Sequence, residues 1–225
     1  MPLGIFGGTF DPVHLGHLRL AEEAADSLGL AGVCWIPAGQ PTHRAQDAKL
    51  PRVTAADRLA MVRLATAGNP RFTVDAGEVE AAVPSYTVPT LERLRAGPAG
   101  TRPRVLLVGA DAFAGMPGWH RWEELFTLAH IAVAHRPGFP IDAASLPPAL
   151  AAHYRERRAE SPALLAESPA GRIVTFAMTQ LAVSATQIRA LLANGRSPRY
   201  LLPDSVIAYI RSRHLYTPSP EPSAP

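Results

Sequence analysis

The sequence predicts an α/β fold, an open and mostly parallel sheet with helices on both faces. Short apolar runs of strand length alternate with longer segments of helical periodicity along most of the chain. The first apolar run ends in a glycine-rich turn that leads directly into an amphipathic segment. Strands that alternate with helices form parallel sheets covered on both faces, because each helix returns the chain to the same edge of the sheet.

Apolar runs bounded by polar or glycine-containing turns predict the strands. The run RVLLVGAD is the most apolar of them, as expected for a strand covered on both faces. The predicted strands span residues 3–6, 32–38, 71–80, 104–111, 131–136 and 172–178.

Segments with apolar residues at helical spacing predict the helices. Thr54 stands directly before one such pattern and can cap the N-terminus of that helix. The predicted helices span residues 15–28, 54–66, 87–96, 184–195 and 204–215.

Residues 1–216 are expected to form a single domain, since a chain of 225 residues with 47% hydrophobic content can bury a sizeable core. Residues 140–171 are rich in Pro, Ala, Ser and charged residues, which predicts a helical excursion between two strands. Residues 217–225 alternate proline with small polar residues. That composition predicts a disordered tail.

The composition excludes several classes of protein. The single cysteine, Cys34, rules out a disulfide framework and a multi-cysteine metal site, and it suits a reducing cytoplasm. The N-terminus has no charged leader region, and no apolar run approaches the roughly 18 residues of a membrane span. We therefore expect a cytoplasmic protein without a membrane partner, and the sequence leaves a homo-oligomer open.

The charge pattern is informative about ligands. The net charge is +3, and Lys49 is the only lysine among 22 basic residues. No long basic run or stripe is present, so no nucleic-acid partner is expected. Arginine remains available for small phosphorylated molecules, because its planar guanidinium suits phosphate.

His14 and His17 stand at the start of the first amphipathic segment, in GIFGGTFDPVHLGHLRLAEEAADSLGL. The start of a helix carries partial positive charge and favours Asp or Glu, so two histidines need a reason. They could be purely structural, or they could bind a metal, but a zinc site needs a third protein ligand and no H-E-x-x-H pattern exists. The third interpretation is phosphate, because a glycine-rich turn that opens a helix presents N–H groups to an anion. It explains both the glycines and the histidines, so we predict a phosphate site and no protein-bound metal.

Two familiar phosphate-binding loops are excluded. The turn lacks the G-x-x-x-x-G-K-[ST] pattern of Walker-type loops and the spacing of the G-x-G-x-x-G dinucleotide fingerprint. This argues against an ATPase and against a hydride-transferring enzyme.

The segment GGTFDPVHLGH, residues 7–17, resembles the H-x-G-H signature of the nucleotidyltransferase superfamily. A second segment, VSATQIR at residues 183–189, resembles the late I-S-x-T-x-x-R element of that superfamily. Ser184 and Gln187 also have the spacing of a capping box, and a well-capped helix would make a rigid phosphate cradle.

Further motifs narrow the resemblance to bacterial nicotinate mononucleotide adenylyltransferases, over nearly the whole chain. Thr42 stands where that family often has a second proline, and Arg44 where lysine is also common, and neither change removes a charge. The motifs are IPAGQPTHR (36–44), PSYTVPTL (84–91), GADAF (109–113), Trp119, HRPG (135–138) and the closing LLPDSVIAYIRSRHLY.

The resemblance implies a Rossmann-like fold and a reaction in NAD biosynthesis. ATP and nicotinate mononucleotide would give nicotinate adenine dinucleotide and pyrophosphate. The 5′-phosphate of the acceptor is an adequate nucleophile, so catalysis would consist mainly of positioning and charge neutralisation. Mg²⁺ would be carried mainly by the ATP phosphates.

The resemblance also implies roles for particular residues. His17 would lie closest to the α-phosphate, while Asp11 before Pro12 is interpreted as a turn residue only. Trp122 is expected to be a core residue. The implied catalytic residues are His14, His17 and Arg189. The implied ATP-binding residues are Gly8, Thr9, Phe10, His14, His17, Ser184, Thr186 and Arg189. The implied mononucleotide-binding residues are Gly7, Arg44, Ser85, Tyr86, Thr87, Gly109, Asp111, Trp119 and Arg136.

The choice of acceptor has its own prediction. A helix that starts near Thr87 would offer N–H groups to the nicotinate carboxylate, and Trp119 would offer a flat face to the pyridine ring. Neither feature includes a carboxylate, so nicotinate is expected to be preferred over nicotinamide. Pantetheine-phosphate adenylyltransferases, cytidylyltransferases and a non-catalytic nucleotide sensor remain as alternatives.

Overall fold

The computed structural model describes residues 1–41, 52–81 and 83–217. In this part of the chain the centre is a parallel sheet with the strand order β4-β2-β1-β6-β7-β8. The chain fills one half of the sheet and then the other, so the order reverses between β1 and β6. The strands are β1 (Leu3–Gly8), β2 (Val33–Pro37), β4 (Phe72–Val74), β6 (Arg104–Gly109), β7 (His130–His135) and β8 (Ile173–Ala177). A second, small parallel pair is formed by β3 (Gln40–Pro41) and β5 (Pro84–Ser85).

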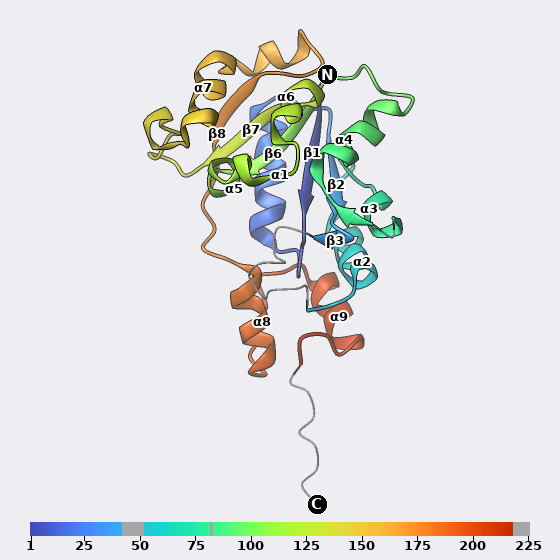
Figure 1. Cartoon of the computed structure of the whole chain (residues 1–225). Helices are drawn as coiled ribbons and strands as arrows, with labels where there is room; N and C mark the ends of the chain where they lie inside the picture. Colours follow the sequence, from blue (N-terminus) through green and yellow to red (C-terminus); the bar gives the residue numbers. More distant parts are fainter. Residues whose placement is uncertain (42–51, 82, 218–225) are drawn as a thin grey trace, which may run out of the picture.

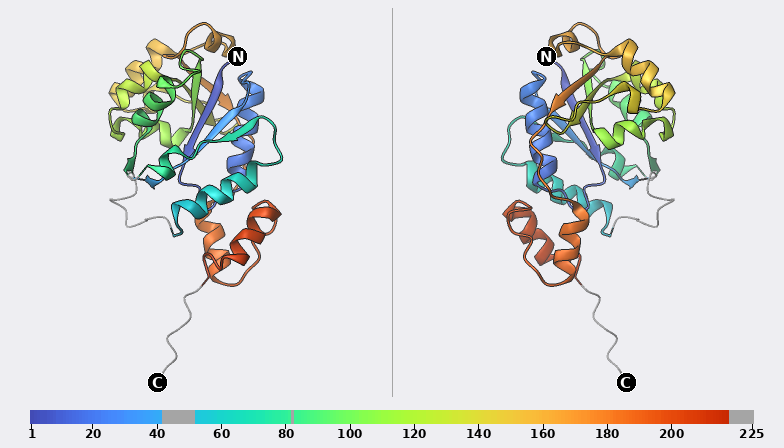
Figure 2. Two further views of the ribbon diagram at one scale, coloured as in Figure 1. Left: turned by 90° about the vertical axis from the view of Figure 1, so that its right-hand side faces the viewer. Right: turned by 90° about the vertical axis from the view of Figure 1, so that its left-hand side faces the viewer.

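Helices cover both faces of the sheet (Figures 1 and 2), as the alternation of apolar runs and helical patterns predicts. One face carries α1 (Leu15–Ser27) and α2 (Ala55–Thr66), together with residues of α8 (Ala185–Ala193) and α9 (Asp204–Ser212). The other face carries α4 (Thr87–Ala96), α5 (Ala110–Ala114), α6 (Leu125–Leu128) and α7 (Pro148–Arg157).

The two cores follow from the pleat of the strands, whose successive side chains point to opposite faces. In β6, Val105 and Leu107 belong to the core under α1, whereas Leu106 and Val108 belong to the core under α4. All four side chains are buried. The Rossmann-like, mostly parallel sheet predicted from the sequence is confirmed.

Two strand predictions need correction. The run 71–80 forms a strand only as far as Val74, and residues 77–80 form the short helix α3 (Gly77–Glu80). Asp75 turns the chain there, because its carboxylate accepts the Gly77 N–H at 2.9 Å and pairs with Arg93. The run 104–111 ends as a strand at Gly109, and Asp111 lies in the first turn of α5.

The segment between β7 and β8 contains α7 and two short 3₁₀ turns, at Ala143–Ser145 and Pro162–Ala166. Leu150 and Tyr154 of α7 are buried in the core under α4, so this predicted excursion contributes to the core. Further 3₁₀ turns lie at Met116–Gly118 and Trp122–Glu124. Of the predicted disordered tail, residues 218–225 lie outside the described ranges.

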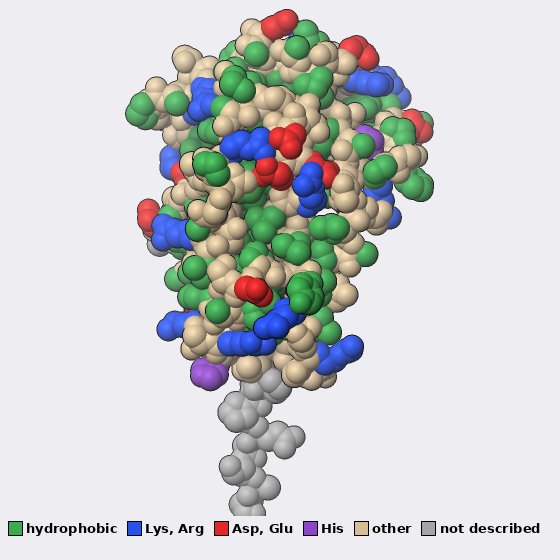
Figure 3. All heavy atoms as spheres, turned by 180° about the vertical axis from the view of Figure 1, so that it is seen from behind, with side chains coloured by type: hydrophobic (Ala, Val, Ile, Leu, Met, Phe, Trp, Pro, Cys, Tyr) green, Lys and Arg blue, Asp and Glu red, His purple; other side chains and the backbone are tan. Residues whose placement is uncertain are grey.

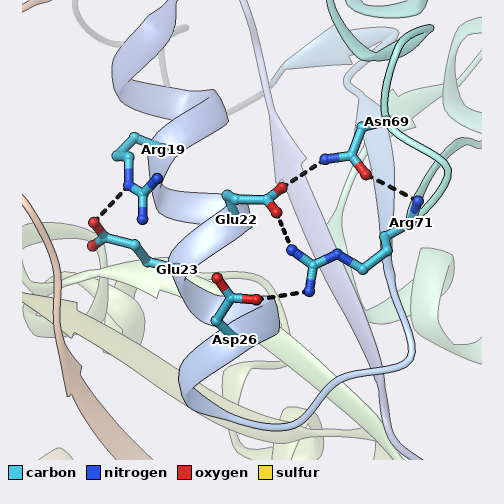
Figure 4. Close-up of polar contacts among 6 residues, drawn as sticks. All are labelled: Arg19, Glu22, Glu23, Asp26, Asn69 and Arg71. Atoms are coloured by element: carbon cyan, nitrogen blue, oxygen red, sulfur yellow. Dashed lines mark hydrogen bonds and ion pairs between the residues drawn. The ribbon is translucent and has the colours of Figure 1, made fainter.

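Polar contacts on both flanks hold α1 in place, and Figure 4 shows those with Asn69 and Arg71 on one flank. Glu22 and Asp26 both pair with Arg71, which precedes β4. On the neighbouring face Glu23 accepts the backbone N–H of Thr179 at 2.6 Å, just beyond β8. Exposed ion pairs contribute little individually, about 1 kcal/mol or less. Together these contacts connect α1 to the segments next to the two outer strands, β4 and β8.

Helices α8 and α9 lie beyond the carboxyl end of β1, at the lower end of the molecule in Figure 1. The face seen in Figure 3 shows several Lys and Arg side chains at this end, whereas acidic and basic side chains lie next to one another higher up. Within the described ranges, no helix is long and apolar enough to cross a membrane.

Candidate active site

A cavity of about 330 Å³ opens at the carboxyl ends of β1 and β6. In doubly wound sheets the point where the strand order reverses is where ligands bind, because the loops of the two halves separate there. This cavity therefore lies where the topology alone would place a site. Its lining includes the predicted residues Gly7, Gly8, Thr9, Ser85, Tyr86, Thr87, Gly109 and Trp119.

His17 lies in the first turn of α1, the helix that follows the glycine-rich turn. The backbone N–H of His14 donates to Nδ1 of His17 at 3.2 Å. A ring nitrogen that accepts a hydrogen bond carries no proton, so the proton of the neutral ring is on Nε2. Hence the donor of the His17 ring is its Nε2–H. The first turn of α1 holds no acidic residue.

His14 is stacked on His17, with ring centroids 3.7 Å apart. Burial lowers the pKa of His14 to about 4, so the ring is neutral near pH 7. Its Nδ1 is buried and has no hydrogen-bond partner among the described residues. A glycine at position 16 suits the stack, because a Cβ there would be in tight contact, 3.1 Å from His14 Nδ1 and 3.1 Å from Val183 Cγ1.

The second predicted phosphate element approaches the first through Arg189. Ser184 caps α8 by accepting the Gln187 N–H at 3.2 Å, as the capping-box spacing predicts. One turn later, the Arg189 guanidinium donates to the carbonyl oxygen of Asp11 at 2.6 Å and to Oγ1 of Thr186 at 3.1 Å. Helix α8 and the loop that follows β1 therefore lie side by side at the carboxyl ends of the strands.

Asp11 does more than start a turn, so its interpretation as a turn residue alone is wrong. Its side chain is buried, and Oδ1 accepts the Tyr216 hydroxyl at 2.7 Å while Oδ2 accepts the Arg52 N–H at 3.0 Å. Burial and the nearby Asp11 charge raise the pKa of Tyr216, so the phenol stays protonated and donates. The end of the described chain is thereby attached to the loop that follows β1. The contact joins residues 205 positions apart, so no local signal could have revealed it.

The opposite wall of the cavity is built around the start of α4. The hydroxyl oxygen of Ser85 accepts the N–H groups of Gly39 and Gln40, at 2.9 and 3.1 Å. Tyr86 precedes the helix without capping it through its side chain, and its ring lies 4.6 Å from the His120 ring. The indole of Trp119 is part of the same wall.

Glu78 also lines this wall, a position that the predicted strand 71–80 did not indicate, because residues 77–80 form a short helix. The Glu78 carboxylate accepts the Thr90 hydroxyl at 2.5 Å, and burial raises the pKa of Glu78. The statement that this wall contains no carboxylate therefore has to be corrected. The hydroxyl groups of Thr90 and Ser85 donate hydrogen bonds to the Glu78 carboxylate. These bonds stabilise its charged form and partly offset the effect of burial on its pKa.

Several predicted site residues lie elsewhere. The ring of Phe10 is buried between Phe6, Trp35 and His17, so it supports His17 from the core. Asp111 and Arg136 are exposed at the ends of β6 and β7, and they are not part of the cavity lining. Arg44 lies outside the described residues. Trp122 packs against the core under α4, as predicted.

The chain is similar to known proteins over most of its length. A family model described as cytidylyltransferase-like matches residues 5–191. The chain is 64% identical over 215 residues to a probable nicotinate-nucleotide adenylyltransferase of Dechloromonas aromatica (strain RCB), which covers 96% of this chain and 97% of the relative. A protein of the same name from Pseudomonas putida (strain W619) is 50% identical over 214 residues, covering 95% of this chain and 94% of that protein.

Among solved structures, the fold is similar to Plasmodium falciparum nicotinic acid mononucleotide adenylyltransferase complexed with NaAD. The TM-score is 0.68 at 14% sequence identity, over 96% of this chain and 97% of that chain. At this identity the similarity concerns the fold alone. The family model and the close relatives establish that the chain belongs to the nicotinate-nucleotide adenylyltransferase family.

Proposed function

We propose that the edge of the sheet between β1 and β6 transfers AMP from ATP to nicotinate mononucleotide, giving nicotinate adenine dinucleotide and pyrophosphate. ATP would bind along the glycine turn and α1, and the mononucleotide along Ser85 and Trp119. The observation that carries the proposal is the stacked pair of His14 and His17 at the start of α1, the helix that follows a glycine turn lining the cavity. Arg189 is held at the same turn by the Asp11 carbonyl.

The reaction needs no protein nucleophile. A 5′-phosphate oxygen of the mononucleotide attacks the α-phosphorus of ATP, and the bond from that phosphorus to the bridging oxygen breaks as pyrophosphate leaves. Negative charge increases on the oxygens around the transferred group. Preorganised donors aimed at such oxygens are the main source of rate enhancement in reactions of this kind. His17 would supply a donor at the α-phosphate, and Arg189 with the capped start of α8 would hold the departing pyrophosphate.

A divalent ion is expected with the triphosphate. Within the described residues, no group of three or more His, Cys, Asp or Glu side chains is arranged to hold a metal ion. The Asp11 carboxylate already accepts hydrogen bonds from Tyr216 and Arg52. We therefore propose that Mg²⁺ arrives with ATP, held by phosphate oxygens and water, as magnesium commonly is. It would neutralise part of the charge on the triphosphate.

The proposal is tested by following pyrophosphate release and dinucleotide formation with the purified chain. ATP with nicotinate mononucleotide should give both products, while CTP in place of ATP, or phosphopantetheine as acceptor, should give little of either. A clear preference for CTP or for phosphopantetheine would replace the proposed substrates. Binding of ATP without turnover of any acceptor would favour a nucleotide sensor instead.

A further inference from the structure

We infer that Arg58 is a positioning residue for the transfer reaction, because it fixes the spacing between the loop that holds ATP and the loop beside the mononucleotide. The inference rests on the proposed function. It concerns a buried arginine of α2 that neither belongs to a sequence motif nor lines the cavity.

The guanidinium of Arg58 joins two loops at the carboxyl edge of the sheet. It is 1% exposed, and its two terminal nitrogens donate to the carbonyl oxygens of Thr9 at 2.8 Å and Gly39 at 2.9 Å. Thr9 follows β1 and belongs to the glycine turn, whereas Gly39 follows the neighbouring strand β2. One planar group therefore holds the ends of two adjacent strands at a defined separation.

The connection continues to the acceptor side through Gly39. While its carbonyl accepts from Arg58, its N–H donates to the hydroxyl oxygen of Ser85 at 2.9 Å. A Cβ at position 39 would lie 2.0 Å from the carbonyl oxygen of Glu78, so only glycine fits between these segments. The series Thr9, Arg58, Gly39, Ser85 thus runs without interruption from the phosphate turn to the start of α4.

Stability alone is a poor reason for a buried arginine here. Removing a guanidinium from water is costly, and apolar residues of similar volume often serve a core as well or better. Nε of Arg58 has no hydrogen-bond partner among the described residues, so the group is not used for maximal bonding. The Asp11 carboxylate offsets part of the cost electrostatically. What an apolar residue could not reproduce is the pair of directed bonds to two loops.

Arg104 provides a matched control at the opposite edge of the sheet. It is 4% exposed, and its guanidinium also donates to backbone carbonyl oxygens, namely those of Leu94, Ala99 and Gly100. These carbonyls belong to α4 and the loop that follows it, far along the chain from the phosphate turn. Loss of Arg104 should therefore destabilise the protein without affecting the geometry of the reaction.

The experiment compares Arg58→Met, Arg58→Lys and Arg104→Met with the wild-type protein. For each, kcat and the KM values for ATP and nicotinate mononucleotide are measured at a temperature where circular dichroism shows the variant to be folded. Arg58→Met should lower kcat on the order of 10²-fold, the cost of a misplacement of roughly 1 Å, and raise KM for both substrates. Arg58→Lys should recover part of kcat, because it keeps the charge but has no planar fork. Arg104→Met should lower Tm while kcat and both KM values stay at wild-type levels.

Wild-type kinetics in folded Arg58→Met would overturn the inference, as would an equal kinetic loss in Arg104→Met. If Arg58→Met does not fold, Arg58→Lys decides the question, since wild-type kinetics in that variant would also overturn it. Failure of the proposed function is distinguishable, because the wild-type protein itself would then show no transfer to nicotinate mononucleotide.

Discussion

The amino ends and the carboxyl ends of the parallel strands form two opposite edges of the sheet. Arginine and histidine residues play opposite parts at these two edges. At the amino edge, the guanidinium of Arg95 donates five hydrogen bonds, all to backbone carbonyl oxygens. At the carboxyl edge, Arg189 makes two hydrogen bonds within the described residues and an ion pair with Asp11 at 3.7 Å, and its side chain is 17% exposed. A guanidinium has five N–H groups, so Arg95 is fully engaged by the fold while Arg189 retains donors for a ligand.

The buried histidines show the same contrast. His130, at the start of β7, donates from Nε2 to the Ser168 carbonyl oxygen at 2.9 Å and accepts the Arg172 N–H at Nδ1 at 3.1 Å. At the carboxyl edge, Nδ1 of buried His14 has no such partner among the described residues. Buried polar atoms in proteins are nearly always satisfied. The unsatisfied Nδ1 of His14 therefore distinguishes the carboxyl edge, where we propose that the substrates bind.

The largest effect that would test this contrast is expected from His17→Ala. It should lower kcat on the order of 10²-fold or more, the loss seen when a preorganised donor to a transition state is removed. The fold should survive, since the variant loses one hydrogen bond at the start of α1, which typically costs about 1 kcal/mol. Steady-state kinetics and thermal unfolding measure the two effects separately. In His130→Ala, by contrast, Tm should fall while kcat is retained. A fully active, folded His17→Ala protein would remove the distinction between the two edges.

A second test is the dependence of stability on pH. The pKa of His14 is about 4 in the folded protein and near 6.5 when unfolded, so the unfolded chain binds the extra proton first. The stability supported by neutral His14 is therefore present above pH 6.5 and is lost as the pH falls towards 4. The loss should reach about 2 kcal/mol at pH 5. Denaturant titrations of wild-type protein and His14→Asn between pH 7.5 and 4.5 measure it. The variant should lose that much less stability over this range, and parallel curves would contradict the assignment.

Trp119→Ala sharpens the division of the site into an ATP side and an acceptor side. Loss of the aromatic face should weaken mononucleotide binding by about 1 kcal/mol, so KM for the mononucleotide should rise roughly fivefold. KM for ATP should stay nearly unchanged, because the ATP side is built from the glycine turn and α1. An equal rise in both KM values would show that the two sides are not independent.

The smallest effect is expected in the choice of acceptor. The difference between a charged and a neutral hydrogen-bond acceptor is about 1 kcal/mol, so kcat/KM should favour nicotinate over nicotinamide mononucleotide roughly fivefold. Glu78 limits this preference, since its carboxylate faces the same cavity. Glu78→Gln should therefore increase the ratio of the two kcat/KM values. A ratio that falls in this variant would exclude Glu78 as an opposing charge, and a wild-type ratio near one would exclude the start of α4 as the carboxylate site.

The sequence by itself determined the local features of this protein. Periodicity predicted α1, α2 and α4 nearly to their observed ends, and Thr54 and Ser184 cap their helices as predicted. These features depend on neighbours within one or two turns, so a short stretch of sequence contains the cause. The glycine turn with its paired histidines is equally local.

Only the tertiary structure decided which distant groups meet at the site. The parallel pairing of β1 with β6 opens the cavity, and no single segment encodes that pairing. Arg58 reaches Thr9 across 49 positions and Tyr216 reaches Asp11 across 205. Asp11 looked like a turn residue and Glu78 like part of a strand, because their partners come from other elements. Long-range contacts arise from packing around two cores, and packing is a property of the whole chain rather than of any motif.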